Sequence, residues 1–472
     1  MLVPTIGVEV HVELKSNTKV FSSSLNAFDN EPNKYVSVID LGYPGTLPKL
    51  NKEVINMALS AAIALNCKIN KVMHFDRKNY FYPDLPKGYQ ITQNKTPIGY
   101  DGYLEIEING KKKKIGIERI QIEEDTCKSI HVEGKTLLNA NRAGVPLIEV
   151  VSKPVIETGE EAALYLEKLR EILLYLGISD VKIEEGSMRC DANISLKEHD
   201  SPEFGTKIEI KNIGSISHVK TSIEYEEKRQ KELLLKGEIL KEETRRFDEK
   251  TLTTVLMRTK ETGNDYRYFP EPDIPYVVLS EEWISEIKNN MPILADELKE
   301  KYRKLGINEN NIKTIISNIS LCKFFETVVD KTNPISAANI LTSEVLGYLN
   351  KNYIKISDMK LNQDNFIKLI EYINIGKISS KQAKDIIPVL IEKELSIDQV
   401  ISELKIEQIS DENILLEIIN KIIDLNPNAV NDFKDGKYRA VKFLMGQIMK
   451  ETKGQASPQI LNKLLTEELS KR

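Results

Sequence analysis

The sequence predicts an α+β protein, with a first part in which strands and helices alternate and a second part that is almost wholly helical. Glycine supports this division, because 17 of the 23 glycines lie before residue 291 and tight turns are therefore concentrated there. Residues 103–109 alternate with period two and end at Asn109-Gly110, a strong hairpin signal. From Met291-Pro292 onward, isoleucine and leucine recur at the three- and four-residue spacing of helices.

Two helices are expected inside the first part. Residues 158–177 begin with the capping pair Thr158 and Glu161, carry leucines at helical spacing and end at Gly177. Residues 217–237 show the same pattern. In the helical part, a polar break near residue 408 indicates a further division. A chain of 472 residues has room for about three domains, and we expect them at residues 1–292, 293–408 and 409–472.

Composition excludes several classes of protein. The 71 acidic and 66 basic residues give a net charge of -5, so a nucleic acid would have to be held by a local basic patch. Four cysteines without a CxxC spacing predict free thiols in a reducing compartment and no disulfide framework. No apolar run approaches the roughly 18 residues of a membrane span, and no charged leader precedes the first predicted strand. We therefore expect a cytoplasmic protein without membrane attachment.

The first strand carries an unusual polar face. Alternation along residues 6–14 places Glu9, His11 and Glu13 together on one side of the strand, opposite a row of valines. Such a face is either the solvated side of an ordinary strand or part of a functional site. The recurrence of isolated acids on other predicted strands favours the functional interpretation.

Those further acids lie at three places. Glu123 and Glu124 end a strand whose isoleucines change parity, which predicts a β-bulge near Glu118-Arg119. Glu149 is the single acid of an otherwise apolar strand, and Asp191 faces away from the apolar side of another. Hard oxygen ligands in such number suit Mg²⁺ better than zinc. A magnesium site of this kind usually completes its ligand shell with phosphate oxygens.

No known nucleotide-binding motif accompanies these acids. The sequence contains no P-loop, no dinucleotide-binding glycine motif and no protein-kinase motif set. Positive charge to balance the phosphates could come from basic residues in or beside the same strands. Each of them could also be an ordinary surface residue. These residues are Arg142, Arg189, Lys207 and Lys211.

Two further segments allow more than one interpretation. Residues 76–90 combine four aromatic residues with Lys78 and Lys87, which fits base stacking, the lining of a polar passage or a core-facing loop. The lysine run at residues 111–114 is typical of a solvated loop tip, with phosphate binding as the alternative.

No nucleophile motif is present, and the histidines form no pair at metal-ligand spacing. Hydrolysis through a covalent acyl-enzyme is therefore not expected.

The C-terminal part contains a basic segment. Residues 433–455 hold six basic residues against two acidic ones, a local charge of +4 in an acidic protein. This pattern fits contact with a phosphate backbone or a solvated helix face. The basic residues are Lys434, Lys437, Arg439, Lys442, Lys450 and Lys453.

With these residues in view, the chain resembles the B subunits of the bacterial glutamine-dependent aspartyl/glutamyl-tRNA amidotransferases. The resemblance runs over essentially the whole length. It is carried in order by IGVEVHVELKS, YPGTLPKLN, FDRKNYFYPDLPKGYQIT, IEEDTCKS, NRAGVPLIEVVSKP, GSMRCDANIS, ETRRFDE, YRYFPEPD and GKYRAVKFLMGQIMKETKGQASP.

The resemblance implies membership of a heterotrimer. In that family an A subunit releases ammonia from glutamine, a small C subunit wraps the other two, and the B subunit acts as a kinase with a tRNA-binding arm. With ATP and Mg²⁺, the B subunit phosphorylates the side-chain carboxylate of Glu-tRNA(Gln) or Asp-tRNA(Asn), and ammonia displaces the phosphate. The implied fold is a cradle domain of the glutamine synthetase type, then a helical domain and a small helical tail domain.

The resemblance also implies roles for individual residues. Metal ligands are expected at Glu9, His11, Glu123, Glu124 and Glu149. Catalytic roles are expected for Glu124, Glu149 and Asp191. From their places in the sequence described above, we also expect nucleotide contacts at Arg142, Arg189, Lys207 and Lys211 and an ammonia passage beside Lys78, Tyr82 and Lys87. The basic segment at residues 433–455 would contact the tRNA.

Two departures from the family pattern stand out. Many members carry a zinc knuckle, whereas the matching positions here are Ser22, Ser24, Ser37 and Asp40, which cannot form a thiolate site, so we predict no zinc. Asn139 replaces the acid that usually precedes the NRAG segment. A carboxylate role at that position is therefore not expected.

Two alternative functions remain open from the sequence. The chain could be a non-catalytic component that only presents the aminoacyl-tRNA, with the acids serving structure. It could instead be a free-standing ligase for a small acid, although that function leaves the basic C-terminal segment without a role.

Overall fold

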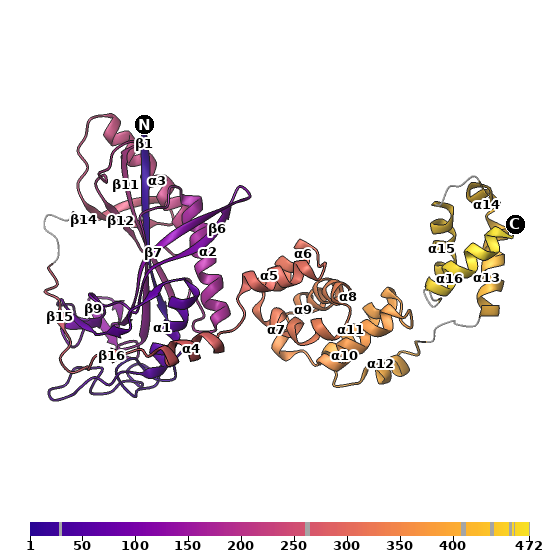
Figure 1. The fold of residues 1–472 in the computed structure, drawn as a ribbon, viewed down its shortest axis with the longest axis horizontal. Coiled ribbons are helices and arrows are strands. Elements are labelled where there is room, and N and C mark those ends of the chain that lie inside the picture. The colour runs from indigo at the N-terminus through magenta and orange to yellow at the C-terminus, as the bar shows by residue number, and fades with distance from the viewer. Residues whose placement is uncertain are drawn as a thin grey trace. The chain divides into compact units, whose positions relative to one another are not determined.

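The computed structural model describes residues 1–27, 31–259, 265–406, 412–434, 439–452, 456 and 458–471. The chain divides into two compact units, Met1–Leu294 and Ala295–Arg472. The first unit combines a large sheet with helices and the second is helical, which confirms the predicted α+β class (Figure 1). Among the described residues, none of the helices has the length and apolar character needed to cross a bilayer.

A nine-stranded sheet forms the centre of the first unit. Its neighbouring strands are antiparallel except for the parallel pair β12 and β13. Across the sheet the order is β14 (Thr253–Thr259), β13 (Glu243–Asp248), β12 (Ile208–Lys211), β11 (Met188–Glu198), β1 (Leu2–Glu13), β10 (Pro146–Ser152), β7 (Lys111–Glu124), β6 (Gly99–Ile108) and β2 (Lys68–Ile69).

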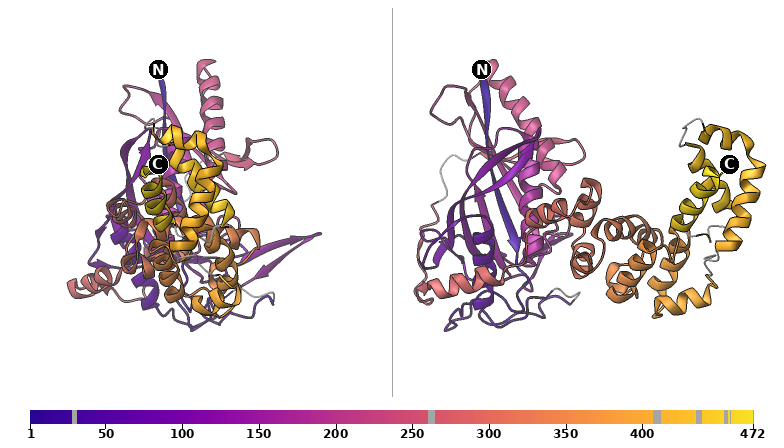
Figure 2. Two further views of the ribbon diagram at one scale, coloured as in Figure 1. Left: turned by 90° about the vertical axis from the view of Figure 1, so that its right-hand side faces the viewer. Right: turned by 45° about the vertical axis from the view of Figure 1, so that its right-hand side comes forward.

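The two faces of this sheet differ in chemistry. Val8, Val10 and Val12 of β1 are buried in the hydrophobic core, as the alternation predicted. The same core includes residues of three helices, α1 (Lys52–Ala64), α2 (Gly159–Leu176) and α3 (Ile216–Leu235), of which α2 and α3 pack against each other (Figures 1 and 2). The helices therefore cover the apolar face, and the polar side chains of the central strands point to the other side.

Several local predictions are confirmed. Asn109 and Gly110 both have positive φ and close the hairpin between β6 and β7. The register of β7 against β10 shifts at Glu118, where the β-bulge was expected. Helix α2 begins after Thr158, whose side chain accepts from the backbone N–H of Glu161, and ends at the left-handed Gly177.

The lysine run on the β6–β7 hairpin is engaged with neighbouring acids. Lys113 donates to Glu161 at 2.7 Å and to Glu157 at 2.9 Å, and Lys112 lies 3.7 Å from Glu105. These contacts support the interpretation as a solvated hairpin tip, because Lys112 and Lys113 already lie beside carboxylates of the protein.

Three small sheets complete the first unit. One contains β15 (Phe269–Pro270), β4 (Asp76–Asn79) and β5 (Tyr89–Thr92), the second pairs β16 (Val277–Val278) with β3 (Val72–Met73), and the third pairs β8 (Lys128–Val132) with β9 (Lys135–Asn139). Helix α4 (Glu281–Asn290) follows them. The β4–β5 pair brings the aromatic segment 76–90 to the end of β7, since β5 contacts β7.

The second unit consists of short helices, as the leucine and isoleucine spacing predicted. In order they are α5 (Ala295–Lys304), α6 (Glu309–Ser317), α7 (Ile319–Val328), α8 (Pro334–Ile340), α9 (Leu346–Lys351), α10 (Gln363–Asn374), α11 (Ser380–Glu392), α12 (Ile397–Glu403), α13 (Glu412–Leu425), α14 (Pro427–Lys434), α15 (Arg439–Glu451) and α16 (Pro458–Ser470). Helices α13 to α16 share a hydrophobic cluster that includes Leu415, Leu444 and Leu461. The predicted break near residue 408 falls among residues outside the described ranges, so the division into three domains stays a prediction.

Gly102 of β6 offers a test of how tightly the first unit is packed. A Cβ atom at this position would lie 2.6 Å from the carbonyl oxygen of Leu65 and 2.4 Å from Sγ of Cys67. The Leu65 oxygen already accepts from the N–H of Tyr103 at 2.9 Å, so it has little freedom to move. We expect Gly102→Ala to lower the free energy of unfolding by about 1–3 kcal/mol, measured by chemical denaturation.

The matched control is Gly347→Ala in α9. A Cβ atom there meets nothing within 4 Å, and alanine favours a helix over glycine. This control should leave stability unchanged or slightly raised. Equal stability of the Gly102→Ala protein and the wild type would show that β6 and the α1–β2 connection are packed more loosely than the structure indicates.

Candidate active site on the polar face of the sheet

Strand register gathers the predicted acids on one face of the sheet. His11 of β1 lies opposite Glu149 of β10 and Arg189 of β11, and Glu9 lies opposite Asp191. Residues directly opposite each other in antiparallel strands point to the same side. The functional interpretation of the Glu9 and His11 face is therefore supported by its neighbours, which contribute further charged groups to the same surface.

An acidic cluster forms around the imidazole of His11. Its Nε2 atom lies 3.7 Å from carboxylate oxygens of Glu123 and Glu149 and 4.0 Å from Glu9. Glu9, His11 and Glu149 each offer one possible ligand atom, and these three atoms lie within 4.8 Å of one another. Glu123 and Glu149 are buried, whereas Glu9 and His11 are half-buried. We call Glu9, His11, Glu123 and Glu149 the acidic cluster.

Two neutral side chains hold the buried acids in place. The amide Nε2 of Gln121 donates to Glu123 and to Glu149, both at 2.8 Å, and the hydroxyl of Thr92 donates to Glu123 at 2.6 Å. Sequence reasoning missed Gln121 and Thr92. The alternation of β7 could have indicated Gln121, which shares the parity of Glu123, but nothing local connects Thr92 to this strand.

The two buried carboxylates have opposite electrostatic surroundings. Burial, reinforced by the charges of Glu123 and Glu9, raises the pKa of Glu149 well above its ordinary value. Burial alone would also raise the pKa of Glu123, but the charges of His11 and Lys78 and the Thr92 hydroxyl together lower it. With Glu9, Glu123 and Glu149 all ionised, the negative charges of the cluster would repel one another, and a divalent cation would relieve this repulsion.

Glu124 is not part of the group of close ligand atoms that surrounds His11. Its carboxylate forms an ion pair with Lys87 and accepts from the backbone N–H of Ile91 at 2.9 Å. The ammonium of Lys87 also lies over the rings of Tyr89 and Phe21, 5.5 and 5.9 Å from their centroids. Of the expected metal ligands, the structure thus brings together Glu9, His11 and Glu149, with Glu123 beside them and Glu124 turned to Lys87.

Two of the expected nucleotide contacts converge on Asp125. Arg189 donates to its carboxylate at 2.6 Å, and Nε of Arg142 lies 3.6 Å away. Glu13 lies in the same charged neighbourhood, where burial and the charge of Asp125 raise its pKa to about 7 against the opposing effect of both arginines. The arginines therefore lie at the same end of β1 as the acids and form a mixed-charge region.

The other two expected nucleotide contacts differ from each other. Lys211 pairs with Asp191 at 2.7 Å and with Glu209 at 3.2 Å. Burial would lower the pKa of Lys211, but Asp191 and Glu209 outweigh it and raise the pKa. Lys207 is exposed and lies just before β12. Asp191 and Lys211 are therefore placed as a pair beside Glu9, whereas Lys207 lies outside that pair.

The residues expected beside an ammonia passage do not all lie near the acidic cluster. Lys78 lies over the rings of Tyr266 and Tyr80, at 5.0 and 5.9 Å from their centroids. Burial would lower the pKa of Lys78, but the charges of Glu123 and Glu149, with Tyr268, raise it. Tyr82 is 65% exposed. Lys78 and Lys87 thus lie beside the glutamates that end β7, and Tyr82 faces solvent.

Tyr266 and Tyr268 were not assigned a role from the sequence, although their segment YRYFPEPD is distinctive. The centroids of their rings lie 5.9 Å apart, and the ring centroids of Tyr266 and Tyr80 lie 6.1 Å apart. The N–H of Asn79 in β4 donates to the Tyr266 carbonyl at 3.0 Å. An aromatic wall of Tyr80, Tyr266 and Tyr268 therefore lies next to Lys78, formed by segments almost 190 residues apart.

The basic residues of the C-terminal segment lie partly on α15. Arg439, Lys442 and Lys450 are exposed, and Ala440, Leu444 and Ile448 of the same helix are buried on its other side. Lys434 is exposed at the end of α14, and Lys437 and Lys453 lie outside the described residues. Phe443, 49% exposed, shares the basic side of α15 and was not singled out from the sequence.

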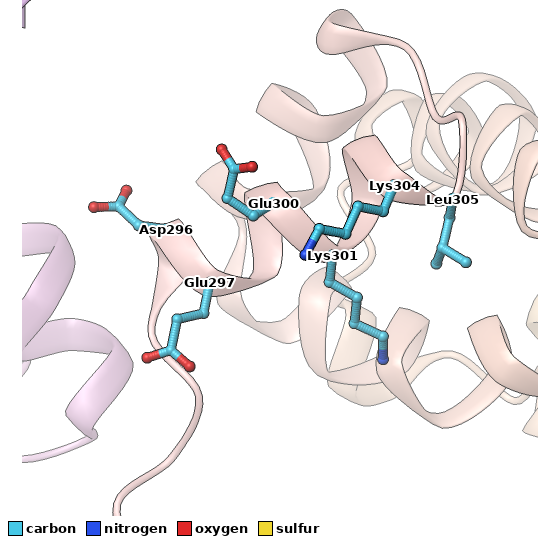
Figure 3. Close-up of a pocket in the computed structure, with 6 residues that line it drawn as sticks. All are labelled: Asp296, Glu297, Glu300, Lys301, Lys304 and Leu305. Atoms are coloured by element: carbon cyan, nitrogen blue, oxygen red, sulfur yellow. The ribbon is translucent and has the colours of Figure 1, made fainter.

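A surface hollow in the second unit has a different character. It lies along α5 and is lined by Asp296, Glu297, Glu300, Lys301, Lys304 and Leu305 (Figure 3). Lys301, the half-buried cation of this set, already donates to Glu326 and Asp330 at 3.2 Å. Since its charges are neutralised locally and no residue of the acidic cluster takes part, we assign no chemistry to this hollow.

Comparison with known proteins matches both parts of the chain to one protein family. Residues 4–285 match the model of the GatB/GatE catalytic domain, and residues 323–469 match that of the GatB domain. The chain is 50% identical over 470 residues to the B subunit of the aspartyl/glutamyl-tRNA(Asn/Gln) amidotransferase of Geobacillus thermodenitrificans. It is equally similar to the corresponding B subunits of Geobacillus kaustophilus and Enterococcus faecalis, and each match covers 99% of both chains. The chain therefore belongs to the family of the aspartyl/glutamyl-tRNA(Asn/Gln) amidotransferase B subunits.

Proposed function

We propose that this chain uses ATP and Mg²⁺ to phosphorylate the side-chain carboxylate of Glu-tRNA(Gln), Asp-tRNA(Asn) or both, and then amidates it with ammonia. The products are Gln-tRNA(Gln) and Asn-tRNA(Asn). The observation that supports this proposal best is the acidic cluster, in which Glu9, His11 and Glu149 offer ligand atoms within 4.8 Å of one another beside the basic Arg142 and Arg189.

The two steps follow from the chemistry of carboxylates. A carboxylate is a poor electrophile, so an oxygen of the tRNA-bound side chain attacks the γ-phosphorus of ATP and ADP leaves. Ammonia then attacks the carbonyl carbon, inorganic phosphate leaves with the electron pair of the broken C–O bond, and the nitrogen loses one proton to give the neutral amide. When bound, Mg²⁺ neutralises charge on the transferring phosphoryl group and orients it.

The side chains of the acidic cluster would hold and orient the cation. Glu149 and Glu9 would provide oxygen ligands, and Gln121 would orient the buried carboxylates by donating to both Glu123 and Glu149. Lys78 contributes a fixed positive charge on the same side, stabilised by Glu123 and Glu149. The cluster is therefore preorganised, which lowers the reorganisation that phosphoryl transfer requires.

Binding of the tRNA involves a second region in this proposal. The exposed side of α15 presents Arg439, Lys442 and Lys450, with Phe443 among them. Cations separated by one or two turns of a helix can follow a phosphate backbone, and an exposed aromatic ring can stack on an unpaired base. This region would position the tRNA without reading its aminoacyl group.

The proposal includes a division of labour within a heterotrimer. We infer that an amidase A subunit supplies ammonia from glutamine, that a small C subunit completes the complex, and that the assembly works in the cytoplasm. The ammonia would arrive beside Lys78 and Lys87, which lie at the glutamates that end β7.

The experiment that tests the function measures ATP cleavage by the assembled amidotransferase with different acceptors. Misacylated Glu-tRNA(Gln) or Asp-tRNA(Asn) should stimulate cleavage, whereas free glutamate or aspartate should not. Stimulation by a free amino acid would indicate a free-standing ligase. Transfer that persists after the acidic cluster is neutralised would indicate a protein that only presents tRNA.

Glutamine hydrolysis provides a further test. Because the sequence carries no nucleophile motif, we expect the purified chain alone to release no glutamate from glutamine, while the complex amidates tRNA with ammonium salts as the nitrogen source. Hydrolysis is followed by the release of labelled glutamate from labelled glutamine. Amidation is followed by identifying the amino acid that is released from the tRNA on deacylation. Glutamate release by the chain freed of its amidase partner would contradict the proposed division.

A further inference from the structure

A lysine without solvent exposure lies outside the acidic cluster. The side chain of Lys19 is 0% exposed, and its ammonium lies 3.4 Å from Oδ2 of Asp40 and 3.3 Å from the carbonyl oxygen of Ala140. Burial lowers the pKa of Lys19, and the carboxylate of Asp40 opposes this effect. Lysine is almost never fully buried unless it is paired, because removing its charge from water is costly.

Three serines complete the surroundings of Asp40. The hydroxyl of Ser22 donates to Oδ1 at 2.7 Å, and Oδ2 accepts from the hydroxyl of Ser24 at 2.7 Å and from the backbone N–H of Ser37 at 2.8 Å. Oδ2 also accepts from the Ser37 hydroxyl at 3.1 Å. We call Lys19, Ser22, Ser24, Ser37 and Asp40 the Asp40 cluster. Four of its members, Ser22, Ser24, Ser37 and Asp40, are the positions that match the zinc knuckle of other family members.

The Asp40 cluster is packed against the turn that precedes β10. Gly144 in this turn has a φ of +80°, and a Cβ atom there would lie 3.0 Å from Oδ1 of Asp40 and 3.4 Å from Cδ of Lys19. The N–H of Val20 donates to the Gly144 carbonyl at 3.1 Å, and the N–H of Gly144 donates to the Asp125 carbonyl at 2.9 Å. The cluster, the turn and the end of β7 are therefore directly connected.

The same turn carries Arg142. Its Nε donates to the carbonyl of Thr126 at 2.9 Å and its Nη2 to the carbonyl of Cys127 at 3.0 Å, which leaves the guanidinium beside Asp125. The ammonium of Lys19 holds the Ala140 end of the turn, and the packing on Gly144 holds the other end. The Asp40 cluster thus contacts the turn on both sides of Arg142, at Ala140 and at Gly144.

A second basic residue rests on the same loop. A Cβ atom on Gly42, two residues after Asp40, would lie 2.7 Å from Cγ of Lys87, and Gly42 has a φ of +64°. Lys87 forms the ion pair with Glu124 at the end of β7. The loop that contains Asp40 therefore packs against Lys87, and the Asp40 cluster contacts the turn that carries Arg142.

We propose that Lys19 and Asp40 are positioning residues that act through Arg142 and set the affinity of the site for the phosphates of ATP. This inference rests on the proposed function. A buried ammonium fixed to a carboxylate and a carbonyl gives the turn a defined position, and a guanidinium binds phosphate most strongly when it is oriented for two parallel hydrogen bonds. Loss of the Lys19 charge should release the turn and weaken nucleotide binding without removing a group that touches the nucleotide.

The experiment compares Lys19→Met with the exposed control Lys49→Met in the assembled amidotransferase. We expect Lys19→Met to raise the KM for ATP and the Kd for MgATP by roughly tenfold, as befits a broken buried ion pair, with kcat at saturating ATP within about twofold of wild type. Lys49→Met should change neither constant. Ser24→Ala removes one donor to Asp40 and should shift the KM in the same direction by less, which keeps the test open if Lys19→Met folds poorly.

A double-mutant cycle with Arg142→Gln shows whether Lys19 acts through Arg142. If it does, Lys19→Met should have almost no further effect on the Kd for MgATP once Arg142 is replaced. Additive effects, or a lowered Tm with an unchanged Kd, would overturn the inference and leave the pair a purely structural role. Arg142→Gln without effect on the Kd would also overturn it. Absence of MgATP binding by the wild-type complex would instead refute the proposed function.

Discussion

Glu149→Gln should abolish most of the tRNA-dependent ATP cleavage, with a loss of kcat of roughly 10²–10³. The substitution keeps the shape of the side chain and the oxygen that accepts from Gln121 at 2.8 Å, but it removes one of the charges that face His11. Rapid-quench measurement of phosphoryl transfer to Glu-tRNA(Gln) gives the rate, and partner-supplied glutaminase activity in the same complex shows that assembly is intact.

Stability distinguishes this effect from damage to the fold. Because burial and the charges of Glu123 and Glu9 already raise the pKa of Glu149, a neutral side chain relieves repulsion inside the cluster. The Tm of Glu149→Gln without added cation should therefore equal or exceed that of the wild type, as is common for residues kept for function. Added Mg²⁺ should raise the Tm of the wild type more than that of the variant.

The matched control is Glu107→Gln, an exposed glutamate on β6. This variant should retain wild-type phosphoryl transfer and the wild-type response of the Tm to Mg²⁺. Normal phosphoryl transfer by Glu149→Gln would exclude Glu149 from the cation site and favour a protein that only presents tRNA.

The alternation of side chains along single strands made much of this site predictable. The polar face of β1, the place of Asp191 on β11 and the bulge at Glu118 all follow from patterns within one strand. These features require no knowledge of which strands are neighbours. They are local consequences of the two-residue period and could be derived from the sequence alone.

Alternation along β7 separates Glu123 from Glu124, because Glu124 shares the parity of the buried Ile120 and Ile122. The partners of the two carboxylates could not be predicted in this way, since they depend on the register of β7 against β10 and on the contact of β5 with β7. Thr92 and Lys87 reach the two glutamates from a segment about 30 residues earlier. Such pairings depend on tertiary packing, which a strand pattern does not encode.

The Asp40 cluster illustrates the same limit. From the sequence, Ser22, Ser24, Ser37 and Asp40 only indicated that a thiolate site could not form. Their hydrogen bonds around one carboxylate, and the burial of Lys19 beside them, became visible only when the loop folded onto the Gly144 turn. A charged side chain in a polar loop is exposed in most proteins, so no local pattern predicts its burial.

Replacing Lys434, Arg439 and Lys442 together by glutamine should raise the KM for misacylated tRNA by roughly 10- to 100-fold at moderate salt. These residues are exposed on α14 and α15, where contact with phosphates needs no change in the fold. Each lost phosphate contact should also lower the slope of log K against log salt by about 0.7–0.9. Filter binding of misacylated tRNA to the complex over a salt series measures both quantities.

The affinity for ATP serves as the internal control, because the acidic cluster belongs to the first unit and the basic side of α15 to the second. A matched triple variant at exposed lysines of α10 and α11, Lys368, Lys381 and Lys384, removes the same charge from a different surface of the second unit. If general attraction of a polyanion were responsible, both triple variants would weaken tRNA binding equally. A specific contact predicts loss only for the α14–α15 variant. An unchanged salt slope in that variant would mean that Lys434, Arg439 and Lys442 do not contact the phosphates of the tRNA.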